Sequence, residues 1–123
     1  MFNHKTQRML KELRSAIYYV DDLPAAKKWY ADTFEITPYF DEPFYVGFQI
    51  GGSELGLDPS ADNYSKGNNS IAYWKTDDMY ADFEKFTAKG VQIHEVVHNV
   101  GGNILVGCIK DDFGNVIGLI EEP

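Results

Sequence analysis

The chain has 123 residues, which is enough for one domain or two small repeats sharing a core, and it excludes a large multidomain enzyme. Its 11 basic and 19 acidic residues give a net charge of −8, which disfavours nucleic acid and anionic membranes as partners. Its single cysteine, Cys108, excludes an intrachain disulfide, and no apolar segment reaches the roughly 18 residues of a membrane span. We therefore expect a cytoplasmic protein.

The first half of the chain predicts a strand, a helix and a hairpin. Residues 16–20 form a short apolar and aromatic run, and Asp22 follows as a helix N-cap with Pro24 in the first turn. The helix is indicated by apolar side chains at helical spacing, namely Leu23, Ala26, Tyr30 and Phe34. Two further strands, residues 44–50 and 54–57, flank Gly51-Gly52, which suits a two-residue turn.

The second half repeats this order 56 residues later. A strand over residues 71–76 leads to Asp77-Asp78, and the helix that follows ends at Gly90. Residues 104–110 and 116–120 then form a second hairpin around a tight turn. The predicted organisation is an N-terminal arm (1–12), a first module (13–58), a polar linker (59–69) and a second module (70–122).

Strand alternation predicts which side chains face away from the helices. A two-residue turn in the first hairpin places Gly47 opposite Gly56, and a four-residue turn in the second places Gly107 opposite Gly118. These glycines either leave open volume for a ligand or accommodate strong sheet curvature. The same alternation turns Cys108 towards the helix, where it would act as a small hydrophobic residue.

Two segments carry a family resemblance: Val-Asp-Asp-Leu-Pro-Ala-Ala-Lys-Lys-Trp-Tyr from residue 20, and Asp-Asp-Phe-Gly-Asn-Val-Ile-Gly-Leu-Ile from residue 111. With this plan the chain resembles the glyoxalase, bleomycin-resistance and extradiol-dioxygenase (vicinal oxygen chelate) superfamily. The resemblance implies an α+β fold of two βαβββ modules that form a curved mixed-sheet cup, usually within a homodimer.

In metal-dependent members of that superfamily, each module supplies one ligand from its first strand and one from its last. The corresponding positions here are Ser15 and Gly56 in the first module and Ile71 and Gly118 in the second. None of these residues normally binds a divalent metal, and a register error of one residue would bring in Glu54 or Asp58 but no histidine. We therefore predict no metal and no cofactor, with a divalent metal as the alternative.

The cup is predicted to bind a small molecule through residues on its concave face. Glu54 is the candidate general base, and Tyr19 or Tyr73 is the candidate hydroxyl donor. The thirteen predicted ligand-binding positions are Ser15, Ile17, Tyr19, Tyr45, Gly47, Gln49, Glu54, Gly56, Ile71, Tyr73, Gly107, Ile109 and Gly118.

Three functions remain open at this point. The leading one is a metal-free small-molecule-binding protein. The second is a glyoxalase-type lyase, isomerase or dioxygenase with an altered or absent metal site, and the third is an accessory subunit with a vestigial cup. A zinc-protease reading of His94-Glu95-Val96-Val97-His98 is rejected, because the β-branched context predicts a strand, on which the two histidines lie about 13 Å apart.

Overall fold

The computed structural model describes residues 9–60, 62 and 64–123, so the predicted arm lies mostly outside the described residues. The first module contains β1 (Ser15–Tyr19), α1 (Leu23–Phe34), β2 (Phe40–Glu42), β3 (Tyr45–Ile50) and β4 (Ser53–Asp58). The second contains β5 (Tyr73–Lys75), α2 (Met79–Ala88), β6 (Gln92–Asn99), β7 (Leu105–Lys110) and β8 (Val116–Glu121). The predicted α+β fold of two βαβββ modules is confirmed.

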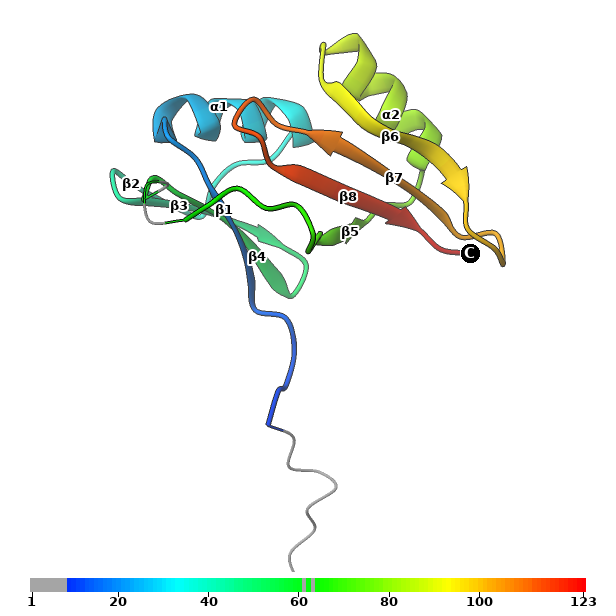
Figure 1. Cartoon of the computed structure of the whole chain (residues 1–123), viewed down its shortest axis with the longest axis horizontal. Coiled ribbons are helices and arrows are strands. Elements are labelled where there is room, and N and C mark those ends of the chain that lie inside the picture. The colour runs from blue at the N-terminus through cyan, green and yellow to red at the C-terminus, as the bar shows by residue number, and fades with distance from the viewer. Residues whose placement is uncertain (1–8, 61, 63) are drawn as a thin grey trace, which may run out of the picture.

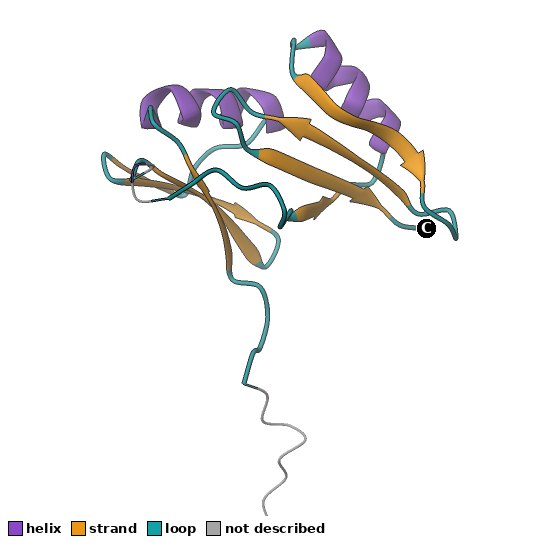
Figure 2. Cartoon of the chain, in the orientation of Figure 1, coloured by secondary structure: helices purple, strands orange, loops and turns teal. Residues whose placement is uncertain are grey.

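Each module folds into a four-stranded mixed sheet with a helix on one side. The strand orders are β1-β4-β3-β2 and β5-β8-β7-β6, with the first strand of each module parallel to its last. Both helices lie on the same side of the molecule, above the two sheets in Figure 1 and Figure 2. The opposite faces of the sheets are therefore free of helices.

Both helices begin at the predicted aspartates. The Asp22 carboxylate accepts a hydrogen bond from the Ala25 amide, and the Asp78 carboxylate accepts one from the Ala81 amide. These contacts satisfy amides that the first helical turn leaves without a backbone partner. Gly90 follows α2 with a φ of 79°, which glycine adopts without strain.

The two modules share one core at the boundary between them. Phe34 of α1 packs edge-to-face on Phe86 of α2, with ring centroids 5.8 Å apart. The Trp74 indole N–H donates to the Tyr18 hydroxyl at 3.1 Å, and these two residues are 56 positions apart. Because 56 is the repeat offset, equivalent positions of the two modules meet here, which places this pair at the axis that relates the modules.

The two hairpins differ in how well the sequence predicts them. In the first, Ile50 pairs with Ser53 and Gly47 with Gly56, as predicted. In the second, Lys110 pairs with Val116, so the turn has five residues rather than four. The reason is Asp111, whose carboxylate accepts hydrogen bonds from the amides of Phe113 and Asn115 and draws one more residue into the turn.

This one-residue shift reverses the faces of β7, as any single-residue slip on a strand does. Gly107 pairs with Leu119 rather than Gly118, and a Cβ at Gly107 would lie 2.8 Å from the Phe83 ring of α2. Ile109 is fully buried in the core. The prediction that Gly107 and Ile109 face the ligand is therefore wrong. Cys108, which was predicted to face the helix, lies opposite Gly118 on the face away from α2, so that prediction is wrong as well.

Candidate functional site

A hollow of about 400 Å³ lies on the helix-free face of the first sheet, and we call it the first-module hollow. Four of its residues, Ser15, Ile17, Tyr45 and Glu54, are predicted ligand-binding positions on β1, β3 and β4. The sequence did not single out its other lining residues, which are Arg14, Tyr39 and Phe40.

Glu54 is the centre of this hollow, and its side chain is only 5% exposed. One carboxylate oxygen accepts hydrogen bonds from Arg14 Nη1 at 2.9 Å, Ser15 Oγ at 2.8 Å and Tyr45 Oη at 2.6 Å. The other oxygen accepts from the Tyr39 hydroxyl. Four donors therefore hold one buried carboxylate, and this arrangement satisfies a group that would otherwise be costly to bury.

These contacts determine the protonation of Glu54. Burial raises the pKa of the carboxyl, but the hydrogen bonds from Tyr39, Tyr45 and Ser15, with the Arg14 charge, outweigh it and hold the pKa below its ordinary value of 4.5. Glu54 is therefore ionised at neutral pH. A carboxylate with a lowered pKa and occupied lone pairs is a weak general base.

The lowered pKa of Glu54 predicts a pH-dependent contribution to stability. A carboxyl whose folded pKa is depressed stabilises the fold fully above its unfolded pKa, and this contribution is lost as the pH falls through the folded pKa. We expect the wild type to be more stable than Glu54→Gln at pH 7 and the difference to shrink below the ordinary pKa of 4.5. Urea unfolding of both proteins from pH 7 to pH 3 measures this. A difference that stays constant with pH would contradict the prediction.

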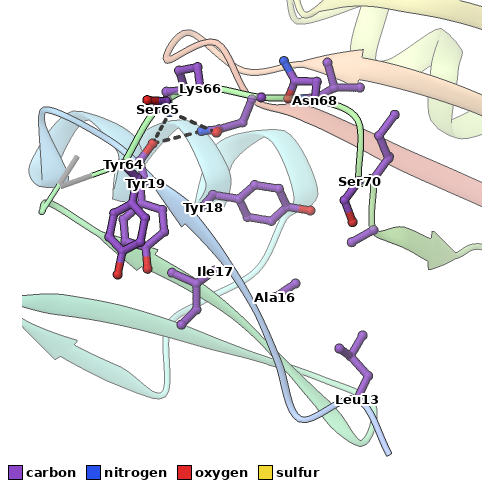
Figure 3. Close-up of a pocket in the computed structure, with 15 residues that line it drawn as sticks. Leu13, Ala16, Ile17, Tyr18, Tyr19, Tyr64, Ser65, Lys66, Asn68 and Ser70 are labelled. Carbon is purple, nitrogen blue, oxygen red and sulfur yellow. Dashed lines mark hydrogen bonds between the residues drawn. The ribbon is translucent and has the colours of Figure 1, made fainter. Parts of the chain in front are cut away.

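A second hollow, the seam cleft, lies where the two modules meet and has a volume of about 480 Å³ (Figure 3). Its walls come from β1, from the segment between the modules and from the start of β8. The predicted ligand-binding residues Ile17, Tyr19 and Ile71 line it. Ile17 lines both hollows, and 43% of its surface is exposed, so the seam cleft and the first-module hollow adjoin along β1.

The predicted linker forms one wall of the seam cleft. The ring of Tyr64 stacks on Tyr19 with centroids 3.8 Å apart, and the two overlap in Figure 3. The Lys66 ammonium donates to the Tyr19 carbonyl and to the Asn115 side chain at 3.0 Å. Asn68 donates to the Gly114 carbonyl and accepts from the Val116 amide. Sequence reasoning missed these residues, because they lie outside the repeat.

The space over the four facing glycines is filled by aromatic or acidic side chains. A Cβ at Gly56 would lie 1.9 Å from the Tyr45 hydroxyl, and one at Gly118 would lie 2.7 Å from the Tyr73 ring. Gly47 lies beneath Glu54 and Tyr39 in the same way. The interpretation that the glycines leave volume for a ligand is therefore wrong. They let tyrosines and Glu54 lie flat against the sheet.

The second sheet carries a different group of side chains. Cys108 Sγ lies 3.9 Å from both the Tyr73 hydroxyl and Glu95 Oε2, and His98 Nε2 lies 3.3 Å from the other oxygen of Glu95. Burial raises the pKa of the Cys108 thiol, the Tyr73 contact opposes it, and Glu95 adds to the rise. Cys108 is thus held as a neutral thiol, which is a poor nucleophile. His94 to His98 lie on strand β6, as predicted.

The residues at the superfamily's metal positions do not fit a metal. Ser15 donates its hydroxyl to Glu54, Ile71 is apolar, and the glycines at 56 and 118 lie under tyrosine rings. In residues 9–60, 62 and 64–123, no three His, Cys, Asp or Glu side chains come together as metal ligands would. The remaining predicted position, Gln49, donates to the carbonyls of Gly51 and Ser53 in its own hairpin.

Two βαβββ modules joined side by side, with one hollow on the first sheet and another where the modules meet, define a two-module cup protein. A sequence profile of the Glyoxalase/Bleomycin resistance protein/Dioxygenase superfamily matches residues 12–119, and the chain belongs to this superfamily. No curated protein gives a significant match in sequence. Across the described residues, no helix has the length and apolar character to cross a membrane.

Solved structures share the fold at low sequence identity. Lactoylglutathione lyase from Agrobacterium tumefaciens is 22% identical with a TM-score of 0.75, and the match covers 93% of this chain and 96% of that one. A superfamily member from Sphaerobacter thermophilus is 22% identical with a TM-score of 0.77, and the match covers 94% and 100%. A superfamily enzyme from Burkholderia phytofirmans is 13% identical with a TM-score of 0.76, and the match covers 92% and 100%.

Proposed function

We propose that this protein binds a small organic molecule along β1, with the polar end of the ligand in the first-module hollow and its apolar body in the seam cleft. The observation that carries the proposal is the exposed Ile17 side chain, which lines both hollows. Pockets that hold small molecules are concave and mostly apolar, with a few converging polar groups. Such polar groups are supplied by the Glu54 cluster, which consists of Glu54 and its four hydrogen-bond donors, Arg14, Ser15, Tyr39 and Tyr45. The apolar surface is supplied by Ile17, Tyr19 and Ile71.

The proposed binding needs no metal. In the first-module hollow the Arg14 guanidinium already balances the charge of Glu54 at 2.9 Å. The four residues at the metal positions of the superfamily offer one hydroxyl, which is committed to Glu54, and no imidazole or carboxylate. We therefore propose recognition or sequestration of an organic ligand, with no cofactor.

Binding is favoured over turnover by the state of the candidate base. The lowered pKa of Glu54 and its four hydrogen-bond donors leave it little capacity to take a proton from a substrate. Neither Tyr19 nor Tyr73 lines the first-module hollow beside it. A lyase or isomerase reaction that begins with proton removal would require another base.

The proposal is tested by screening one- and two-ring aromatic fragments against isotope-labelled protein by NMR. We expect saturable amide shifts at Ile17, Ile71 and their neighbours. Ile17→Glu should weaken the best fragment by about tenfold or more, because it places a charge against the apolar body. Val96→Glu adds the same charge at an exposed valine on β6 and should leave binding unchanged. Shifts confined to other surfaces, or equal effects of the two variants, would contradict the proposal.

We also propose that the protein is a cytoplasmic homodimer. Support for self-association comes from Phe44, which is 65% exposed between β2 and β3 and packs edge-to-face on Phe40. Exposed aromatic clusters of this kind favour protein interfaces. Sedimentation velocity should give a dimer that Phe44→Lys shifts towards the monomer. A monomer at all concentrations would contradict this part.

A further inference from the structure

The Glu54 cluster fixes the direction of every hydroxyl hydrogen around it. An ionised carboxylate can only accept hydrogen bonds, so Tyr39 and Tyr45 must each point their one O–H hydrogen at Glu54. A hydroxyl that has donated its hydrogen can offer only lone pairs to any other partner. Towards the open hollow, Tyr39 and Tyr45 are therefore hydrogen-bond acceptors.

Ser15 adds no free donor to the hollow, and the free donors of Arg14 lie on an exposed side chain. The Ser15 hydroxyl donates to Glu54, and its oxygen accepts from Arg14 Nη1 at 2.7 Å. Arg14 Nη1 thus serves both Ser15 and Glu54. The rest of the guanidinium belongs to a side chain that is 76% exposed, where an ion pair with a ligand is screened by water.

We propose that the ligand's polar end carries hydrogen-bond donors, as an amidinium, ammonium or amide N–H group does, and that it binds the oxygens of Tyr39 and Tyr45. This inference rests on the proposed function and names the ligand chemistry of the same site. The net charge of −8 acts in the same direction, since it raises the local concentration of cations over anions. The polar end of such a ligand lies beside Ile17, from which its apolar body extends into the seam cleft.

Three probes of matched shape test the polarity: benzamidine with donors only, benzamide with a donor and an acceptor, and benzoate with acceptors only. Affinities are measured from NMR shifts in the first-module hollow at pH 7. We expect benzamidine to bind at least about tenfold more tightly than benzoate, since one charge-assisted hydrogen bond is worth that much, with benzamide in between. Benzoate binding as tightly as benzamidine, or more tightly, would overturn the inference.

Glu54→Gln reverses the polarity of the site. The glutamine amide must donate through its NH₂ group, so at least one of the tyrosine hydroxyls becomes its acceptor and can turn its own hydrogen towards the hollow. We expect this variant to lose its preference for benzamidine and to gain affinity for benzoate. Glu84→Gln makes the same charge change at an exposed position on α2 and should keep the wild-type order. An unchanged order in Glu54→Gln would contradict the inference.

A pair of milder variants keeps the test valid if Glu54→Gln does not fold. Tyr39→Phe and Tyr45→Phe each remove one acceptor oxygen and leave the carboxylate in place. Each should weaken benzamidine binding several-fold, and unchanged binding in both would overturn the inference. If benzoate is preferred, the ligand chemistry is wrong while the binding site stands. If no probe or fragment shifts this face at all, the proposed function itself fails.

Discussion

Asp111→Ala is expected to lower the free energy of unfolding by about 3–4 kcal/mol, because it leaves several buried donors without a partner at once. Asp111 is 4% exposed, and its carboxylate accepts a hydrogen bond from the Tyr30 hydroxyl at 2.6 Å. It also accepts at 2.8 Å from the amides of Phe113 and Asn115 and from the Asn115 side chain. The substitution therefore disconnects the second hairpin turn from helix α1 of the first module.

The matched control for Asp111→Ala is Tyr30→Phe. It removes only the hydroxyl and leaves Asp111 with three donors, so we expect a loss of about 1 kcal/mol. Urea unfolding followed by circular dichroism measures both variants. Equal losses for the two would show that the contact between Tyr30 and Asp111 carries the whole effect and that the turn amides find other acceptors.

Gly56→Ala is expected to weaken ligand binding by about tenfold and to destabilise the fold by about 1–3 kcal/mol. The new Cβ would lie 1.9 Å from the Tyr45 hydroxyl, so the ring has to move. Any movement that clears this overlap lengthens the 2.6 Å hydrogen bond from Tyr45 to Glu54. The change therefore disrupts the polar cluster of the first-module hollow without removing any of its polar atoms.

Gly52→Ala is the control for backbone effects at glycine in the same hairpin. Its added Cβ would meet nothing within 4 Å, and its φ is not positive, unlike that of Gly51. We expect wild-type stability and wild-type benzamidine affinity for Gly52→Ala. A crystal structure of Gly56→Ala with Tyr45 unmoved, or unchanged benzamidine affinity, would contradict the prediction for Gly56.

Local signals in the sequence were sufficient for most of the fold. The 56-residue repeat, the aspartate caps and the Gly51-Gly52 turn each have one physical solution, and the structure contains all of them. The register of the second hairpin depended on a side chain. In the sequence, Asp111 is an ordinary polar residue before a turn. Its carboxylate nevertheless determines the length of that turn, and the length determines which face of the sheet each residue of β7 occupies.

The candidate site was harder to predict because it depends on contacts between distant residues. Ser15 was identified from the superfamily's metal positions, and strand alternation added Glu54 and Tyr45 on the same face. Arg14 and Tyr39, which complete the cluster, lie outside the predicted strands, so no periodic pattern pointed to them. Likewise, Lys66 and Asn68 bind the linker to the second module beside the seam cleft. Nothing in the composition of the linker distinguishes these two residues from solvated polar residues.

The contact between Tyr18 and Trp74 shows that the two modules are not interchangeable where they meet. If two identical single modules paired symmetrically, the residue at their axis would meet its own copy, and both sides would have to carry the same side chain. Here one side donates an indole N–H and the other accepts it on a phenol oxygen, a combination that requires different residues. The two halves therefore carry different residues at their point of contact, and the hydrogen bond between them depends on that difference. If the first half paired with a copy of itself, Tyr18 would face another Tyr18, and the hydrogen bond from an indole N–H to a phenol oxygen could not form.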